Sequence, residues 1–188
     1  MIRRSAVVYI TILLALAGAY YFLRDRAQPA DFQGTLEPTT EVRYLFPAEA
    51  GYPTGIRVEA KSGESVEVAR NAENAWMLIQ PVEAEAEQGA SEAAASQVST
   101  MRVLNQIPEV DRGLVGLADP DYVLTVQFSG GTERSVNIGV VTPTESGYYV
   151  EDSSGGEVLI VSKSAVESVL RLLSAPPYVE TPASSPLP

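Results

Sequence analysis

The chain has 188 residues, 45% of them hydrophobic, and a formal net charge of −11, which is enough for one ordinary domain with a sizeable core. It contains no cysteine and no histidine, which excludes disulfide frameworks, thiolate nucleophiles, zinc sites with Cys or His ligands and Ser-His triads. Because nucleic acid and anionic lipid would repel an acidic domain, neither is an expected ligand of it, and no cofactor is indicated.

The first 26 residues are predicted to form an N-terminal transmembrane anchor. Residues 6–23 carry no charge, and their length is close to the roughly 20 residues that a helix needs to cross a bilayer. Aromatic rings prefer the headgroup region. The predicted anchor residues are accordingly Tyr9, Tyr20, Tyr21 and Phe22.

The charges that flank residues 6–23 predict the orientation of this anchor. Arg3, Arg4 and the α-amino group favour a cytoplasmic N-terminus, although Arg24 and Arg26 weaken the bias. We therefore predict a single-pass protein of the cell membrane whose acidic C-terminal part is extracytoplasmic. A cleaved secretory signal is the alternative, because residues 15–19 contain small-x-small cleavage patterns, and it places the domain on the same side.

Pro-containing segments flank the predicted domain. Residues 27–41 have two prolines, one glycine and no apolar period, so residues 27–53 are interpreted as a stalk with the strand that leads into the domain. Five prolines follow from Ser174 onward, which predicts an extended, disordered tail over residues 175–188. A Pro-rich ligand for a partner protein is the alternative for this tail.

The first half of residues 54–174 shows a strand period and then a helix period. Residues 56–68 alternate between apolar and polar side chains about a turn at Ser62-Gly63, which predicts a hairpin. Residues 75–81 follow as a third strand. The next segment is rich in alanine and predicts a helix. Its apolar residues at helical spacing are Ala90, Ala94, Val98, Met101 and Leu104.

A similar order of elements recurs in the second half. Residues 122–138 alternate about a turn at Gly130-Gly131, two further strands follow, and residues 162–173 read as a helix with a candidate capping box from Ser164 to Glu167. The predicted fold class is α+β, with two hairpin-strand-helix units, antiparallel sheets and helices packed on one face, behind the N-terminal transmembrane helix. Duplication of one unit is a hypothesis.

Two ordered stretches carry a family resemblance. The first has the form Trp-x-Leu-x-x-Pro before a helix, and the second combines Gly-Leu-x-x-Pro, a hairpin ending in Ile-Gly and a Tyr-Tyr-Val strand. Over residues 54–174 the chain resembles the bacterial family called domain of unknown function 4340. The matching residues are Trp76, Pro81, Gly116, Leu117, Pro120, Ile138, Gly139, Thr142, Pro143, Gly147, Tyr148, Tyr149 and Val150.

This resemblance implies a role beside other membrane proteins. Many members are longer, with several such units behind an N-terminal membrane helix, and some are encoded near ABC-type transporter or gliding-motility components. The resemblance implies an accessory role at a membrane complex. It supplies no catalytic residues.

Two groups of carboxylates are candidates for chemistry. Glu83, Glu85 and Glu87 alternate with small residues and could act as acid and base or bind calcium, although a solvated approach to a helix explains them as well. Residues 151–157 place oxygen ligands around a tight turn. They lack the spacing of a calcium loop, and hairpin turns favour the same residue types.

The predicted partner contacts are Tyr148, Tyr149, Asp119 and Asp121. The two tyrosines are adjacent on a strand, so they point to opposite faces, and we expect one to pack inside and the other to be exposed. The aspartates flank Pro120 and form either an acidic contact for a partner or only a turn. Trp76 is expected in the core, with stacking on a ligand as the alternative.

The function predicted from these features is non-enzymatic. The chain would be a membrane-anchored accessory or scaffold subunit, with the bilayer as its partner through residues 6–23 and protein–protein contacts to other subunits of an ABC-type transporter or a similar complex. One alternative is a binding module for an envelope polymer or a cationic ligand. The other is a carboxylate-dependent hydrolase, which requires two acidic residues that converge in one pocket.

Overall fold

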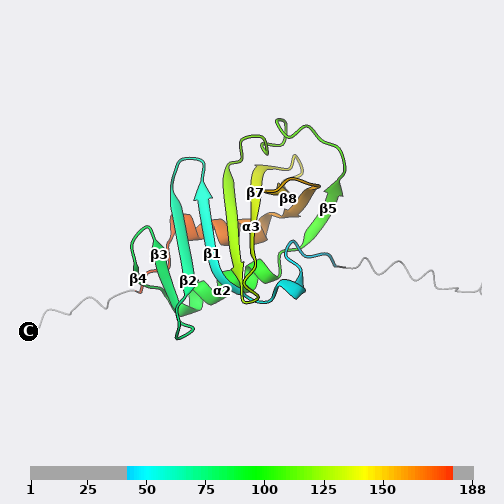
Figure 1. Cartoon of the computed structure of the whole chain (residues 1–188). Helices are drawn as coiled ribbons and strands as arrows, with labels where there is room; N and C mark the ends of the chain where they lie inside the picture. Colours follow the sequence, from blue (N-terminus) through cyan, green and yellow to red (C-terminus); the bar gives the residue numbers. More distant parts are fainter. Residues whose placement is uncertain (1–41, 180–188) are drawn as a thin grey trace, which may run out of the picture. The chain divides into compact units, whose positions relative to one another are not determined.

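A computed structural model describes residues 42–179 and shows one antiparallel sheet with two helices (Figure 1). The nine strands lie in the order β4-β3-β2-β1-β6-β7-β8-β9-β5. The strands are β1 (Pro53–Ala60), β2 (Ser65–Arg70), β3 (Trp76–Gln80), β4 (Ala84–Glu85), β5 (Val103–Ile107), β6 (Tyr122–Phe128), β7 (Glu133–Val141), β8 (Gly147–Asp152) and β9 (Val158–Ser162). The two α-helices are α2 (Gln88–Ser99) and α3 (Lys163–Ser174), and a short 3₁₀ turn, η1 (Ala48–Ala50), precedes β1.

The predicted fold class is wrong, because the two expected units share one sheet. β1 of the first half and β6 of the second pair along their whole length, with Ile56 opposite Val126 and Val58 opposite Leu124. These apolar side chains belong to the same core. Pairing β1 with β6 therefore continues one buried stripe and removes two strand edges that separate sheets would leave open. The described chain is one large antiparallel sheet with two short helices.

No helix within residues 42–179 is long and apolar enough to cross a membrane. The predicted anchor at residues 6–23, with Tyr9, Tyr20, Tyr21 and Phe22, lies outside the described residues. The predicted membrane location therefore stays a prediction.

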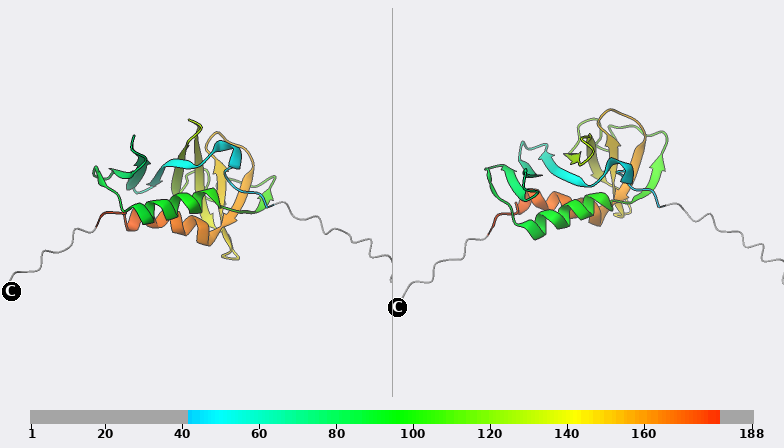
Figure 2. Two further views of the ribbon diagram at one scale, coloured as in Figure 1. Left: turned by 90° about the horizontal axis from the view of Figure 1, so that it is seen from below. Right: turned by 60° about the horizontal axis from the view of Figure 1, so that its bottom comes forward.

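Both helices cover the same face of the sheet, where they lie side by side (Figure 2). The main core lies beneath them, and Trp76 is buried in it with 1% of its surface exposed, as predicted. The indole N–H donates to Glu92 on α2 at 2.8 Å, and the Arg70 guanidinium lies over the ring at 4.4 Å. The indole hydrogen bond is the main cause that lowers the pKa of Glu92, and the charge of Arg70 adds to it.

The loop between β5 and β6 folds back over the opposite face of the sheet. Val115 and Leu117 from this loop form a second small core with Val158 of β9. The Val140 N–H of β7 donates to the Val115 carbonyl at 3.0 Å. A Cβ at Gly139 would lie 2.1 Å from that carbonyl oxygen, so only glycine fits there.

Several predicted boundaries shift in the structure. α2 ends at Ser99, so Leu104, which fits the helical spacing, lies instead on the edge strand β5 and is half exposed. α3 begins at Lys163, so Ser164 lies inside the helix and does not start the predicted capping box with Glu167. Ser162, which directly precedes the helix, makes no capping hydrogen bond through its side chain. Tyr178, within the predicted tail, instead forms a β-bridge with Ala86, and residues 180–188 of that prediction lie outside the described residues.

Candidate functional site

A groove of about 770 Å³ lies beside the C-terminal half of α3. Three other parts of the chain complete it, namely the β1–β2 turn, the start of β6 and β8. We call it the tyrosine groove. Its lining residues are Ala60, Ser62, Glu64, Tyr122, Tyr148, Glu167, Leu170, Arg171, Leu173 and Ser174.

The inner wall of the tyrosine groove is the rim of the main core. Tyr122 is the first residue of β6 and pairs with Ala60, the last residue of β1, so its ring lies where the sheet ends. Tyr148 lies on β8 with its ring on the same face. Both rings, together with Leu170 and Leu173 of α3, are partly buried and pack against the main core. The groove thus offers apolar and aromatic surface to a ligand.

Two carboxylates place negative charge near the Tyr148 ring. Burial is the main cause that raises the pKa of the Tyr148 phenol, and the negative charges of Glu167 and Asp121 raise it further. Glu167 is only loosely paired, with Lys163 at 3.9 Å. Within residues 42–179 Asp121 forms no direct ion pair, although its charge helps to raise the pKa of Lys61. Glu167 and Asp121 therefore both disfavour the charged form of the Tyr148 phenol.

The four predicted contact residues do not all reach this groove. Tyr148 lines it and Asp121 lies beside it, whereas Tyr149 is half-buried on the opposite face of the sheet against the second small core. The Asp119 carboxylate pairs with Lys61, and this hydrogen bond is the main cause that raises the pKa of Lys61. Neither tyrosine is fully exposed, so the expected exposed ring is not found.

Sequence reasoning missed three residues of the groove, Tyr122, Glu64 and Glu167. The alternation along β6 and the helical stripe of α3 could assign each of them to a face. No local pattern shows that a turn, a strand and a helix meet at one place.

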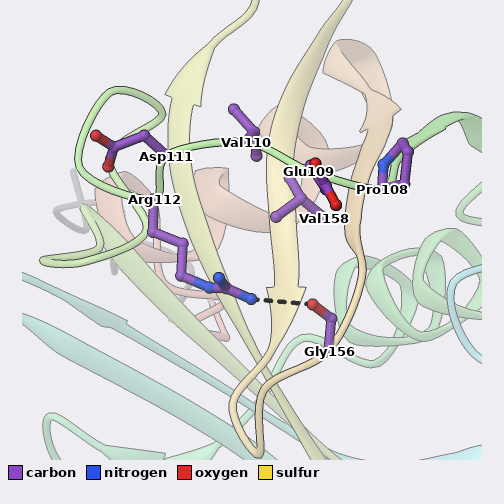
Figure 3. Close-up of a pocket in the computed structure, with 7 residues that line it drawn as sticks. All are labelled: Pro108, Glu109, Val110, Asp111, Arg112, Gly156 and Val158. Carbon is purple, nitrogen blue, oxygen red and sulfur yellow. Dashed lines mark hydrogen bonds between the residues drawn. The ribbon is translucent and has the colours of Figure 1, made fainter.

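A second cavity, the loop cleft, holds about 450 Å³ between the β5–β6 loop and β9 (Figure 3). Its lining residues are Pro108, Glu109, Val110, Asp111, Arg112, Gly156 and Val158. The Arg112 Nε and Nη2 donate to the buried Glu151 carboxylate at 2.6–3.0 Å, and Nη2 also donates to the Gly156 carbonyl at 3.1 Å. These hydrogen bonds are the main cause that lowers the pKa of Glu151. Arg112 therefore fastens the loop to the sheet.

The other carboxylate candidates are occupied at separate places. The Glu87 carboxylate accepts the Gly89 and Ala90 N–H groups at the start of α2, at 2.9 and 2.5 Å. The Asp152 carboxylate accepts the Ser154 hydroxyl and N–H, which lowers the pKa of Asp152. Glu83 and Glu85 are exposed at β4. Among the described residues, no three His, Cys, Asp or Glu side chains form a group that could hold a metal ion.

No family model, no curated protein and no solved structure matches this chain. The resemblance to the domain of unknown function 4340 family therefore rests on the residues quoted for it. Two of these have a clear physical role, since Gly116 has a φ of +72° and Gly139 lies directly against the Val115 carbonyl. Both glycines allow the β5–β6 loop to approach β7.

Proposed function

We propose that this chain is a non-enzymatic accessory subunit of a membrane assembly and that its extracytoplasmic domain binds a partner protein in the tyrosine groove. The observation that carries this proposal is the pair of half-buried rings, Tyr122 and Tyr148, beside Leu170 and Leu173 in an open groove. Tyrosine is favoured at protein interfaces because its ring is apolar and its hydroxyl can remain in water.

The distribution of polar groups favours binding over catalysis. Glu64 lies on a turn, whereas Glu167 and Arg171 lie on α3. The Ser62 hydroxyl donates to the Glu64 carboxylate at 3.4 Å, but both side chains are exposed on the turn, and among the described residues no other side chain donates to Glu64 to orient it as a base. The carboxylates considered for chemistry, which are Glu83, Glu85, Glu87, Glu151 and Asp152, lie outside the groove. Residues 6–23, as the predicted anchor, would keep the domain beside its partner at the bilayer.

Copurification of the full chain from mild detergent tests this proposal. We expect a partner protein to copurify with the wild type and to be reduced about tenfold or more by the double substitution Tyr122→Ala and Tyr148→Ala, because interface aromatics are frequent hot spots. Tyr52→Ala is the matched control, since Tyr52 is 60% exposed and lies outside the groove. Equal recovery with the double variant, or a wild-type chain that purifies alone, would contradict the proposal.

A further inference from the structure

Three carboxylates approach the tyrosine groove from three different elements. Glu64 belongs to the β1–β2 turn, Asp121 immediately precedes β6, and Glu167 lies on α3. Arg171 is the only cationic side chain in the lining, and it forms no ion pair with a carboxylate among the described residues. Outside the lining, Lys61 pairs with Asp119 and also interacts with the charge of Asp121, and Lys163 is shared between Glu167 at 3.9 Å and Glu145 at 3.6 Å. Negative charge at the groove is therefore incompletely neutralised by the protein itself.

From this arrangement we infer that the groove takes a basic side chain, a lysine or an arginine, from an extended segment of the partner protein. The inference rests on the proposed function and names the chemistry of the ligand. A basic side chain has an apolar stem and a charged end. The stem fits against Leu170 and Leu173, while the charged end meets the tyrosine rings and the surrounding carboxylates.

The Tyr148 ring supplies an internal reporter of such a cation. Its phenol already lies in the negative field of Glu167 and Asp121, which adds to the effect of burial and raises the pKa of Tyr148. A cation bound beside the ring would favour the phenolate. Binding should therefore lower this pKa, whereas an uncharged ligand that only buries the ring would raise it further.

The test uses the full chain in detergent micelles with ¹³C-labelled tyrosine rings. The probes are four capped peptides of the sequence Gly-Ala-Xaa-Ala-Gly, in which Xaa is lysine, arginine, norleucine or glutamate. Arginine is included because it keeps its charge at the alkaline pH where Tyr148 titrates, whereas lysine does not. At neutral pH we expect the lysine peptide to shift the signals of Tyr122 and Tyr148 and to bind about 3- to 20-fold more tightly than the norleucine peptide. The arginine peptide should lower the Tyr148 pKa. The affinity of the lysine peptide should fall as salt is added.

Three outcomes would overturn the inference. Equal affinity of the norleucine peptide would show that the groove recognises only apolar surface. Tighter binding of the glutamate peptide would show that Arg171 dominates recognition. If no peptide shifts the signals of Tyr122 and Tyr148, the groove takes no such side chain.

A matched pair of variants tests the role of charge. Glu167→Gln removes one carboxylate of the groove and should weaken lysine-peptide binding about threefold, since the side chain is half exposed. Glu133→Gln removes an exposed carboxylate at the start of β7, outside the groove, and should leave the affinity unchanged. An equal effect of the two variants would indicate only long-range attraction to an acidic protein and would overturn the inference.

Failure of this inference and failure of the proposed function give different results. If norleucine and lysine peptides bind alike while the Tyr122→Ala and Tyr148→Ala substitutions still abolish copurification, the partner contact stands and only the ligand class is wrong. If those substitutions leave the partner in place, the proposed function fails whatever the peptides do.

Discussion

Arg112 and Glu151 form the ion pair that joins the β5–β6 loop to β8. The Glu151 side chain is only 4% exposed, whereas Arg112 is 50% exposed. Replacement of the arginine would leave a buried carboxylate with only the Gly156 N–H, at 3.2 Å, as a hydrogen-bond donor. The loss of folding stability then comes mainly from the unpaired buried charge rather than from the lost contact.

We therefore expect Arg112→Met to lower the free energy of unfolding at neutral pH several times more than a substitution at a fully exposed ion pair does. Urea unfolding followed by the fluorescence of the single tryptophan, Trp76, measures the change. Arg43→Met is the control. Arg43 pairs with Glu157 at 3.5 Å, both side chains are more than half exposed, and such a pair contributes less than about 1 kcal/mol.

The dependence on pH identifies the group responsible. In the wild type the pKa of Glu151 is lowered in the folded state, so its stabilisation is present above the unfolded pKa of about 4.3 and is lost as the pH falls through the folded pKa. In Arg112→Met, burial without a cation should raise that pKa. The difference in the free energy of unfolding between the wild type and the variant should then shrink as the pH falls from 7 to 5. A difference that stays constant over this range would show that the carboxylate is not its cause.

At the scale of elements, the β5–β6 loop depends on a glycine in the strand beneath it. Gly139→Ala would place a Cβ 2.1 Å from the Val115 carbonyl oxygen. The nearest atoms all belong to the backbone of Val115 and Gly116, so no flexible side chain can move aside. We expect a loss of about 2–4 kcal/mol, or detachment of the loop, because overpacking of this kind forces the backbone to shift. Faster hydrogen exchange of the Val140 amide, which bonds to that carbonyl, would report detachment.

Gly113→Ala provides the comparison within the same loop. A Cβ there would meet only the Asp111 side chain at 3.2 Å, which can move. The substitution should change the stability by less than about 1 kcal/mol. If both alanine variants behave alike, the contact between Gly139 and the loop does not hold the loop in place.

The same elements show how far the sequence can be interpreted. Residues 56–68 and 122–138 form hairpins where apolar and polar side chains alternate, because one face of each strand is buried and the other is not. Leu104 misleads because it continues the spacing of α2 by chance after the helix has ended. Val115 and Leu117 show no period, so their second small core is visible only once the loop is folded.

For the candidate site, sequence reasoning could reach Tyr148 and Asp121 but not the groove that connects them. An alternating pattern gives the face of each strand and leaves its neighbours in the sheet undetermined. The groove needs Glu64, Tyr122 and Glu167, which are separated by more than forty residues from one to the next. These residues meet only because β1 pairs with β6 and because α3 lies beside the β1–β2 turn, the start of β6 and β8.

At the scale of the whole molecule, the pairing of β1 with β6 decides whether the two halves are separate bodies. Main-chain pairs join the halves from Pro53 opposite Phe128 to Ala60 opposite Tyr122. One core runs beneath both halves, from Trp76 on β3 to Val150 on β8 and Leu172 on α3. A chain with two independent units would lack this shared core. One cooperative unfolding transition is therefore expected for the described domain.

Ile138→Ala tests this cooperativity at a distance. Ile138 lies on β7 with 2% of its surface exposed, and β6, β1 and β2 separate β7 from β3, which carries Trp76. The cavity should cost about 2–5 kcal/mol. Since the halves share one core, the fluorescence of Trp76 should report the whole loss, with a lower urea midpoint and an unchanged slope. Leu114→Ala, at a side chain that is 80% exposed, should leave the urea midpoint unchanged.

The contradicting outcome is a Trp76 fluorescence transition that Ile138→Ala leaves unchanged, while circular dichroism shows earlier unfolding elsewhere. That result would mean that the first half folds alone and that the sheet does not join the halves into one cooperative body.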